Sequence, residues 1–275
     1  MERFSTRLKQ AVARTGGFLC VGLDVDMAKL PEGIPKDARG AYQFCRAIVD
    51  ATKDLAAAYK PNLAFFEALG PAGWEMLEAL RKSMPPGALF VADAKRGDIG
   101  NTSRAYAEAF FGRLKCDALT VAPYMGKDSV EPFLGYPGSC VFVLCLTSNP
   151  SAAEFETQKL EDGSFLYEKV AKTALEWGKH TQGEVGLVVG ATQAETLGAI
   201  RSLAPQAPFL VPGVGAQGGD LESVLRDGRS SDGAGLLVNA SRSILYASKG
   251  PDFALAAKAE ATRMIQAMKP YMPKN

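Results

Sequence analysis

The sequence is poor in the side chains that bind metals. It has one histidine, His180, and five cysteines, none of which lies in a C-x-x-C pair. Because a structural zinc site needs several such ligands at close spacing, we expect no metal site. The cysteines are odd in number and scattered, and three of them lie in apolar runs. We therefore expect buried, reduced thiols of a cytosolic protein rather than disulfides. The five are Cys20, Cys45, Cys116, Cys140 and Cys145.

The chain also lacks an excess of charge of either sign. Its 31 lysine and arginine residues balance 30 acidic residues, which gives a net charge of +1. The overall charge therefore gives no reason to expect nucleic acid or an anionic membrane as a partner. Any basic site must be a local cluster.

The N-terminal segment, residues 1–17, lacks an apolar stretch long enough for a signal peptide or a membrane span. Phe4, Leu8 and Val12 fall on one face of a helix, and charged residues occur throughout the segment. Such a helix can lie on a membrane surface or cover a protein core. We favour a helix that covers one end of the core.

Short apolar runs rich in Val, Leu and Phe recur along the chain, with helical stretches between them. Most runs are continuous, as expected of parallel strands that are buried on both faces. Eight such strands alternating with helices predict an α/β fold, a single (β/α)8 TIM-barrel domain spanning residues 1–275. The connections after the fourth and seventh strands are not assigned. The strands are expected at 18–24, 58–66, 88–95, 118–124, 140–147, 185–191, 208–214 and 235–240, and the helices at 41–57, 71–83, 101–113, 163–180, 193–203 and 252–268.

A doubly wound open sheet is the alternative architecture. It is supported by GVGAQG at 213–218, which fits the G-x-G-x-x-G pattern of dinucleotide-binding folds. In those folds the motif follows the first strand, whereas here it follows the seventh and no second half of the fold comes after it. We interpret it as a phosphate-binding loop at the end of a late barrel strand. A nicotinamide-dependent enzyme is accordingly the least favoured function.

Polar and charged residues gather where the expected strands end. In barrels of this kind the active-site groups lie at the C-terminal ends of the strands. A charged residue at the end of an apolar strand is unfavourable unless it is paired or used in function. The residues at these ends are Asp24, Lys60, Asp93, Lys95, Thr147, Ser148, Pro212, Ser241 and Arg242.

The most informative segment is FVADAKRGDIGNTS, residues 90–103. Asp93 and Lys95 are two residues apart, so on a strand they project to the same face, toward the mouth of the barrel. Asp98 follows Gly97, where the strand has ended, and its side chain can point elsewhere. Taken alone, D-x-K-x-x-D fits a structural ion pair near a strand end as well as it fits a catalytic group.

Within this segment, D-A-K-R-G-D-I-G-N-T closely resembles the signature of the orotidine 5'-monophosphate decarboxylase family. The resemblance continues in G-L-D on the first strand, Y-K-P-N on the second, T-S-N-P after the fifth, P-G-V-G-A-Q-G-G after the seventh and S-R-S-I after the eighth. The length and T-S-N-P are similar to the longer bacterial branch. Where many relatives have glycine before the phosphate-binding arginine, this chain has Ser241, whose backbone N–H can still donate.

The resemblance implies a cytoplasmic, cofactor-free enzyme that converts orotidine 5'-monophosphate to UMP and CO2, the last step of de novo pyrimidine nucleotide synthesis. It also implies a homodimer whose active sites are shared across the interface. Lys60, Asp93, Lys95 and Asp98 match the family's alternating charge network, in which Asp98 reaches into the neighbouring subunit's site. The implied substrate contacts are Asp24 and Lys60 to the ribose, with Thr102 from the neighbouring subunit, Ser148 to the pyrimidine, Gln217 and Arg242 to the phosphate, and Pro212 and Ser241 as further contacts.

The chemistry of the reaction agrees with these residues. Loss of CO2 from C6 of the pyrimidine leaves an electron pair in the ring plane, where no carbonyl group can absorb it. An enzyme without a cofactor must stabilise that charge electrostatically. Lys95, held charged between carboxylates, can attract the developing carbanion and protonate C6, while Asp93 faces the leaving carboxylate. Arg242 and a Gly-rich loop after strands seven and eight suit a phosphate dianion.

Two further functions stay open at the level of the sequence. One is a metal-dependent sugar-phosphate decarboxylase of the same barrel superfamily, which shares D-x-K-x-x-D but would need a magnesium site. T-S-N-P and P-G-V-G-A-Q-G-G favour the nucleotide substrate instead. The other is a catalytically silent phosphate-binding barrel. The charged set around Asp93 and Lys95 argues against it, because a simple binding protein has no use for such an array.

Overall fold

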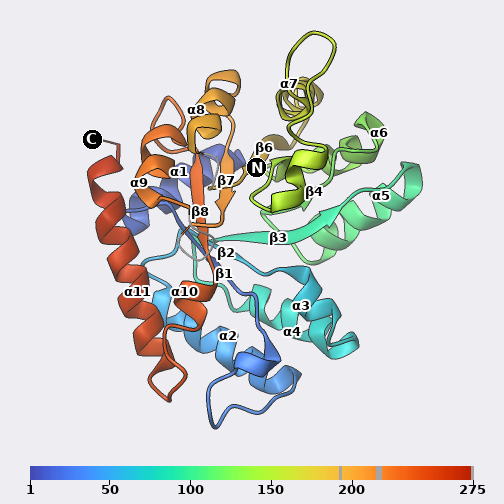
Figure 1. Ribbon diagram of the computed structural model, residues 1–275. Helices are drawn as coiled ribbons and strands as arrows, with labels where there is room; N and C mark the ends of the chain where they lie inside the picture. Colours follow the sequence, from blue (N-terminus) through green and yellow to red (C-terminus); the bar gives the residue numbers. More distant parts are fainter. Residues whose placement is uncertain (192–193, 215–218, 274–275) are drawn as a thin grey trace.

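The computed structural model describes residues 1–191, 194–214 and 219–273, and these form a closed barrel of eight parallel strands (Figure 1). Each strand pairs with the next along the chain, and β8 closes the barrel against β1, with Leu19 opposite Val238. The predicted (β/α)8 fold is confirmed, and the doubly wound sheet is wrong. The strands are β1 (Leu19–Gly22), β2 (Ala58–Lys60), β3 (Leu89–Arg96), β4 (Ala118–Val121), β5 (Cys140–Leu146), β6 (Glu184–Val189), β7 (Phe209–Pro212) and β8 (Leu236–Ala240).

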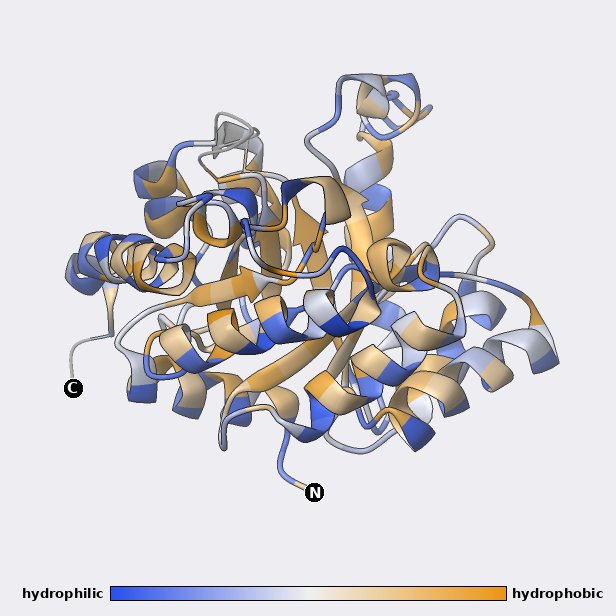
Figure 2. Cartoon of the chain, turned by 90° about the horizontal axis from the view of Figure 1, so that it is seen from below, coloured by the Kyte–Doolittle hydropathy of each residue, from blue (hydrophilic) through white to orange (hydrophobic). Residues whose placement is uncertain are grey.

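Helices surround the barrel, and the strands at its centre are predominantly apolar while blue, hydrophilic residues lie on the outer helices (Figure 2). The connections that the sequence left unassigned contain the short helices α6 and α9. The helices are α1 (Phe4–Thr15), α2 (Ala38–Thr52), α3 (Leu63–Glu67), α4 (Pro71–Lys82), α5 (Gly100–Ala107), α6 (Lys127–Val130), α7 (Leu166–Trp177), α8 (Ala194–Leu203), α9 (Leu221–Asp227), α10 (Arg242–Leu245) and α11 (Phe253–Met268), with the π-helical segment η2 (Glu108–Arg113) and short 3-10 turns η1 (Met27–Lys29), η3 (Glu131–Gly135), η4 (Pro150–Glu154) and η5 (Lys269–Tyr271).

The helix expected at 41–57 ends earlier, at Thr52. Arg14 of α1 donates to the carbonyl oxygens of Lys53 and Ala56, at 3.0 and 3.1 Å. These bonds satisfy carbonyl groups that a continuing helix would have used internally. The chain therefore turns before it enters β2, a long-range contact that local sequence does not reveal.

The strand expected at 58–66 is also shorter, ending at Lys60. The Asn62 side chain accepts a hydrogen bond from the backbone N–H of Ala64 at 3.2 Å, which caps helix α3. Asparagine is among the preferred N-cap residues because its oxygen satisfies an otherwise unpaired N–H. The apolar residues after Asn62 thus belong to a helix at the rim of the barrel.

Helix α1 lies across the N-terminal ends of the strands, as predicted. Phe4 and Leu8 are buried, and the Phe4 ring meets Phe142 of β5 edge-on with the ring centroids 5.8 Å apart. Burial of each such side chain stabilises a fold by roughly 1.5–3 kcal/mol. Arg7 pairs with Asp117, immediately before β4, and fixes the helix to this end. The opposite end of the barrel stays available for an active site.

All five cysteines are free and buried, as expected. Burial raises the pKa of the Cys20 thiol to about 12, so it stays protonated at neutral pH. In the part of the chain that the structure describes, no helix combines the length and the apolar character needed to cross a membrane.

Candidate active site

A cavity of about 380 Å³ opens at the C-terminal ends of β1, β2, β3, β7 and β8. This is the end of a (β/α)8 barrel at which active sites are found. It brings together residues that are 218 positions apart in sequence, from Asp24 after β1 to Arg242 after β8. The residues singled out in the sequence that line the cavity are Asp24, Lys60, Asp93, Pro212, Ser241 and Arg242.

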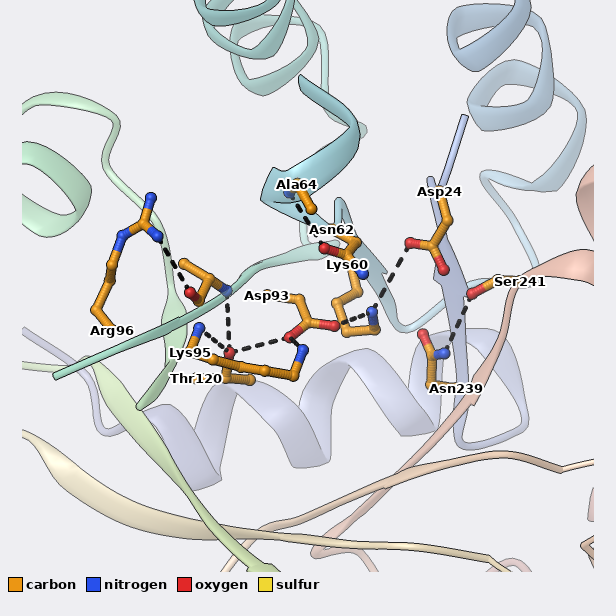
Figure 3. A network of polar contacts seen from close by, with 11 residues as sticks. Asp24, Lys60, Asn62, Ala64, Asp93, Lys95, Arg96, Thr120, Asn239 and Ser241 are labelled. Atoms are coloured by element: carbon orange, nitrogen blue, oxygen red, sulfur yellow. Dashed lines mark hydrogen bonds and ion pairs between the residues drawn. The ribbon is translucent and has the colours of Figure 1, made fainter. Parts of the chain in front are cut away.

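Four charged side chains alternate in sign in one row (Figure 3). Asp24, Lys60 and Asp93 line the cavity, and Lys95 lies next to Asp93 but outside the lining. The Lys60 ammonium lies 2.6 Å from Oδ2 of Asp93 and 3.9 Å from Oδ1 of Asp24. The Lys95 ammonium lies 2.5 Å from Oδ1 of Asp93. Asp93 is thus held between two lysines, and Lys60 between two carboxylates. The Lys60 side chain is 3% exposed, whereas that of Lys95 is 49% exposed, so Lys95 is the more accessible of the two ammonium groups.

The pairing keeps the buried groups ionised. Burial alone would lower the pKa of Lys60, but the charges of Asp93 and Asp24 outweigh it and hold that pKa above its ordinary 10.5. Burial alone would raise the pKa of Asp93, but the charges of Lys60 and Lys95 and their hydrogen bonds hold it well below its ordinary 3.8. A charged group inside a protein is retained only when such partners compensate its lost hydration. Lys60 and Asp93 are therefore a fixed pair of opposite charges at neutral pH.

Asp93 and Lys95 do lie together, but a regular strand does not put them there. The register between β3 and β4 shifts between Ala92 and Arg96. Within this bulge Lys95 has a φ of +48°, in the left-handed region that residues other than glycine rarely adopt. The alternation of side chains along a regular strand therefore predicts the correct neighbours, but it is the bulge that places Lys95 beside Asp93. A bulge of this kind re-aims a side chain near a functional site.

Ser241 and Arg242 lie at the start of α10, on the β8 side of the cavity. Asn239, the penultimate residue of β8, donates from Nδ2 to Oγ of Ser241 at 3.2 Å (Figure 3). Gly22 of β1 makes room for this pair, because a Cβ there would lie 1.9 Å from Oγ of Ser241. The Arg242 side chain is exposed and lines the cavity. Gln217, the other residue expected to bind phosphate, lies outside the described residues.

Ser148 follows β5 and does not line this cavity. Its Oγ is buried and, among the described residues, has no hydrogen-bond partner. Gly190, which follows β6, permits its position, because a Cβ there would lie 2.2 Å from that oxygen. The preceding Thr147 is fixed by Glu156, which accepts hydrogen bonds from its backbone N–H at 2.6 Å and from its hydroxyl at 2.9 Å. A buried hydroxyl without a partner can serve a ligand.

Four of the expected site residues do not line the cavity of their own chain, namely Lys95, Asp98, Thr102 and Ser148. Asp98 accepts a hydrogen bond from the N–H of Ile99 at 2.8 Å, and within the described ranges none of the ion pairs of Lys60 and Lys95 involves it. Thr102 is exposed on α5, which projects away from the barrel axis (Figure 1).

Sequence reasoning missed several polar residues at the site. Asn62 and Asn239 line the cavity, and Oδ1 of Asn239 is buried without a hydrogen-bond partner in the described part of the chain. Tyr246 also lines it, donating to the carbonyl of Asp24 at 3.0 Å and accepting from the N–H of Asp26 at 2.7 Å. Asn62 lies within Y-K-P-N and could have been found there. Tyr246 carries no such signal.

Among the described residues, no three or more His, Cys, Asp or Glu side chains are grouped so that they could hold a metal ion. The charged array has lysines where a metal site would have further carboxylates. The residues present are thus suited to electrostatic stabilisation and proton transfer by the side chains themselves.

Comparison with known proteins gives one consistent result. A profile of the orotidine 5'-phosphate decarboxylase / HUMPS family matches residues 17–257. The orotidine 5'-phosphate decarboxylase of Roseiflexus castenholzii is 49% identical over 266 residues, covering 96% of this chain and 97% of that protein. The solved structure of Leishmania donovani OMP decarboxylase is 40% identical with a TM-score of 0.83, covering 98% of this chain and 99% of that one. Leishmania donovani UMP synthase is 41% identical with a TM-score of 0.85, and there the match spans 98% of this chain and 57% of that longer chain. The chain therefore belongs to the orotidine 5'-phosphate decarboxylase / HUMPS family.

Proposed function

We propose that this protein is a carboxy-lyase that converts orotidine 5'-monophosphate to UMP and CO2 in the cytoplasm, as the last step of de novo UMP synthesis. The observation that carries the proposal is the alternating array of Asp24, Lys60, Asp93 and Lys95 beside a cavity that also holds Arg242. The family description also names HUMPS, but curated relatives carry the decarboxylase name and match this chain over nearly its whole length.

The substrate spans the cavity from its phosphate to its pyrimidine. Arg242 and the N–H of Ser241 bind the phosphate, together with Gln217. A guanidinium and a helix start both favour a dianion. Asp24 and Lys60 bind the ribose hydroxyls. The pyrimidine then extends toward Ser148, whose buried hydroxyl lacks a partner among the described residues, and Pro212 forms part of the wall.

The bond-breaking and protonation steps then use the charged side chains of the array. The bond between C6 and the carboxylate breaks, CO2 leaves, and the electron pair stays on C6. The Lys95 ammonium stabilises this charge and transfers a proton to C6, and the lysine regains its proton from water. Asp93 holds that ammonium at 2.5 Å and faces the leaving carboxylate. Preorganised charges of this kind act most strongly where water is excluded.

Asp98 and Thr102 belong, in this proposal, to the active site of a second copy of the chain. Their positions support this, since Asp98 takes no part in the described ion pairs of Lys60 and Lys95, and Thr102 is exposed on α5. Asp98 of one subunit completes the charge array of its partner, and Thr102 adds a ribose contact. The functional unit is a homodimer with two shared sites.

The activity is tested by the loss of ultraviolet absorbance when the purified, metal-stripped protein is mixed with orotidine 5'-monophosphate. We expect full turnover that excess chelator does not change. Turnover that requires added magnesium, or a sugar-phosphate acid as the preferred substrate, would support the metal-dependent alternative instead. Absence of turnover in a folded protein would refute the proposal.

The shared site is tested by mixing subunits of Lys95→Ala and Asp98→Ala, each expected to be nearly inactive as a homodimer. In a mixed dimer one site carries both substitutions and the other carries neither. Random pairing makes about half of the dimers mixed, so roughly a quarter of wild-type activity should return. If activity stays at the sum of the parents while mass spectrometry shows mixed dimers, Asp98 acts within its own chain.

A further inference from the structure

The bulge that carries Asp93 and Lys95 is filled by a side chain of the neighbouring strand. Ala92 lies opposite Leu119 and Arg96 opposite Val121, so residues 93–95 of β3 face a single residue of β4, Thr120. Thr120 is 1% exposed. Its Oγ1 accepts hydrogen bonds from the backbone N–H groups of Ala94 and Lys95, both at 3.0 Å. The threonine oxygen thus replaces the backbone acceptor that these two N–H groups would have in a regular strand pair.

These two bonds fix the direction of the threonine proton. A hydroxyl group has one proton and two lone pairs. Because both N–H groups donate to the oxygen, the proton is left for Oδ1 of Asp93, which lies 3.0 Å away (Figure 3). The same carboxylate oxygen accepts the hydrogen bond from the Lys95 ammonium. One buried hydroxyl is therefore joined to the backbone of Lys95 and to the carboxylate that holds its ammonium.

The backbone of Lys95 needs such support. Its φ of +48° is unfavourable for a residue with a Cβ and persists only where the surroundings fix it. Both N–H groups bound by Thr120 lie in this strained segment. Without the hydroxyl, two partly buried N–H groups would lose their acceptor, and the chain would be able to relax toward a regular strand. The Lys95 side chain would then leave in another direction.

We propose that Thr120 is a positioning residue for the decarboxylation, holding the Asp93 carboxylate and the left-handed Lys95 backbone so that the lysine ammonium points at the reacting carbon. This rests on the roles proposed above for Asp93 and Lys95. Thr120 does not line the cavity and acts through these two residues.

The test compares Thr120→Val, which keeps the branched shape without the hydroxyl, with Thr120→Ser, which keeps the hydroxyl. We expect kcat to fall about 100-fold in Thr120→Val with KM changed only a few-fold, because the array is misaligned while the substrate contacts remain. Thr120→Ser should restore kcat to within a few-fold of wild type. The acid limb of the kcat profile should also move to higher pH in Thr120→Val, since loss of a donor to the ionised carboxylate raises its pKa.

Thr52→Val is the matched control. Thr52 is fully buried in α2 and donates to the carbonyl of Ile48 at 2.8 Å, so this change removes a buried hydroxyl away from the cavity. It should affect Tm but not the pH profile of kcat. If Thr120→Val fails to fold, Thr120→Ala is compared with Thr120→Ser in its place.

A wild-type kcat in Thr120→Val would overturn the role of Thr120. An equal loss of kcat in Thr120→Val and Thr120→Ser would overturn it as well. Lys95→Ala separates this failure from that of the proposed function. If Lys95→Ala is inactive while Thr120→Val matches wild type, only the positioning role falls. If Lys95→Ala keeps wild-type turnover, the role proposed for Lys95 is wrong, and absence of turnover in the folded wild-type protein would refute the proposed function itself.

Discussion

Replacement of Lys60 by methionine removes the cation at the centre of the array and keeps most of the side-chain volume. Lys60 is 3% exposed and lies 2.6 Å from Asp93 and 3.9 Å from Asp24. Removing one partner of a buried ion pair costs about 3–5 kcal/mol, because the other charge is left without compensation. Asp93 still keeps Lys95, which is half-exposed, so the lower end applies, about 3 kcal/mol. For a chain of this size that corresponds to a fall in Tm of roughly 6–12 °C.

The loss should depend on pH in a defined direction. In the Lys60→Met protein the pKa of Asp93 rises, because burial still raises it and one of the two opposing lysines is gone. At neutral pH the carboxylate is charged and poorly compensated, and at lower pH it takes up a proton. The difference in Tm from wild type should therefore be largest near pH 7 and shrink as the pH falls toward about 4.5.

Thermal unfolding of the single and double variants measures this. Lys60→Met combined with Asp93→Asn should regain at least half of the Tm lost in Lys60→Met, because the uncompensated charge is gone while an amide oxygen can still accept from Thr120. Lys179→Met, which breaks an ion pair exposed on both sides, is the matched control and should change Tm little. A Lys60→Met protein with the same Tm as Lys179→Met would refute this explanation. So would a double variant whose Tm lies below that of Lys60→Met by as much as Asp93→Asn alone lowers the Tm of wild type.

Two further predictions concern activity. In steady-state assays, Arg242→Ala should lower kcat/KM on the nucleotide by an amount that corresponds to about 2–5 kcal/mol of lost transition-state stabilisation. It should hardly change kcat/KM on an analogue without the phosphate, and equal losses on both substrates would indicate a different role. The pKa of Asp93 lies well below its ordinary 3.8, so kcat at saturating substrate should show no ionisation of this carboxylate from pH 7 down to about 5. A drop in kcat that titrates near pH 6 and disappears in Asp93→Asn would contradict this expectation. The ionised carboxylate also adds to the free energy of unfolding, and this contribution is present above pH 3.8 and is lost as the pH falls further.

The sequence is sufficient to predict the barrel and the end at which its active site lies. Continuous apolar strands followed by charged residues leave few other arrangements, since a charge at a strand end must be paired or used. Lys60 and Asp93 are found in this way, and the structure pairs them. The same reasoning places residues only by strand, and gives no distance between side chains.

What the sequence misses depends on local irregularity and on long-range contacts. Thr120 lies in a run of apolar residues, so the sequence predicts a core position for it. Its proposed role depends on a bulge in the neighbouring strand, which the sequence does not reveal. Asn239 likewise lies in the apolar run of β8, where the sequence gives it no signal. Asp98 and Thr102 cannot be placed from one chain, since their proposed partners belong to another copy.

Turnover by Lys95→Ala shows whether this lysine carries the decarboxylation. Lys95 is proposed both to stabilise the carbanion at C6 and to protonate it, so its removal should lower kcat at least about 1,000-fold. Binding of UMP, measured by titration calorimetry, should stay within a few-fold of wild type, because the phosphate and ribose contacts remain. A folded Lys95→Ala protein that retains a tenth of wild-type turnover would contradict the claim that this lysine carries the decarboxylation.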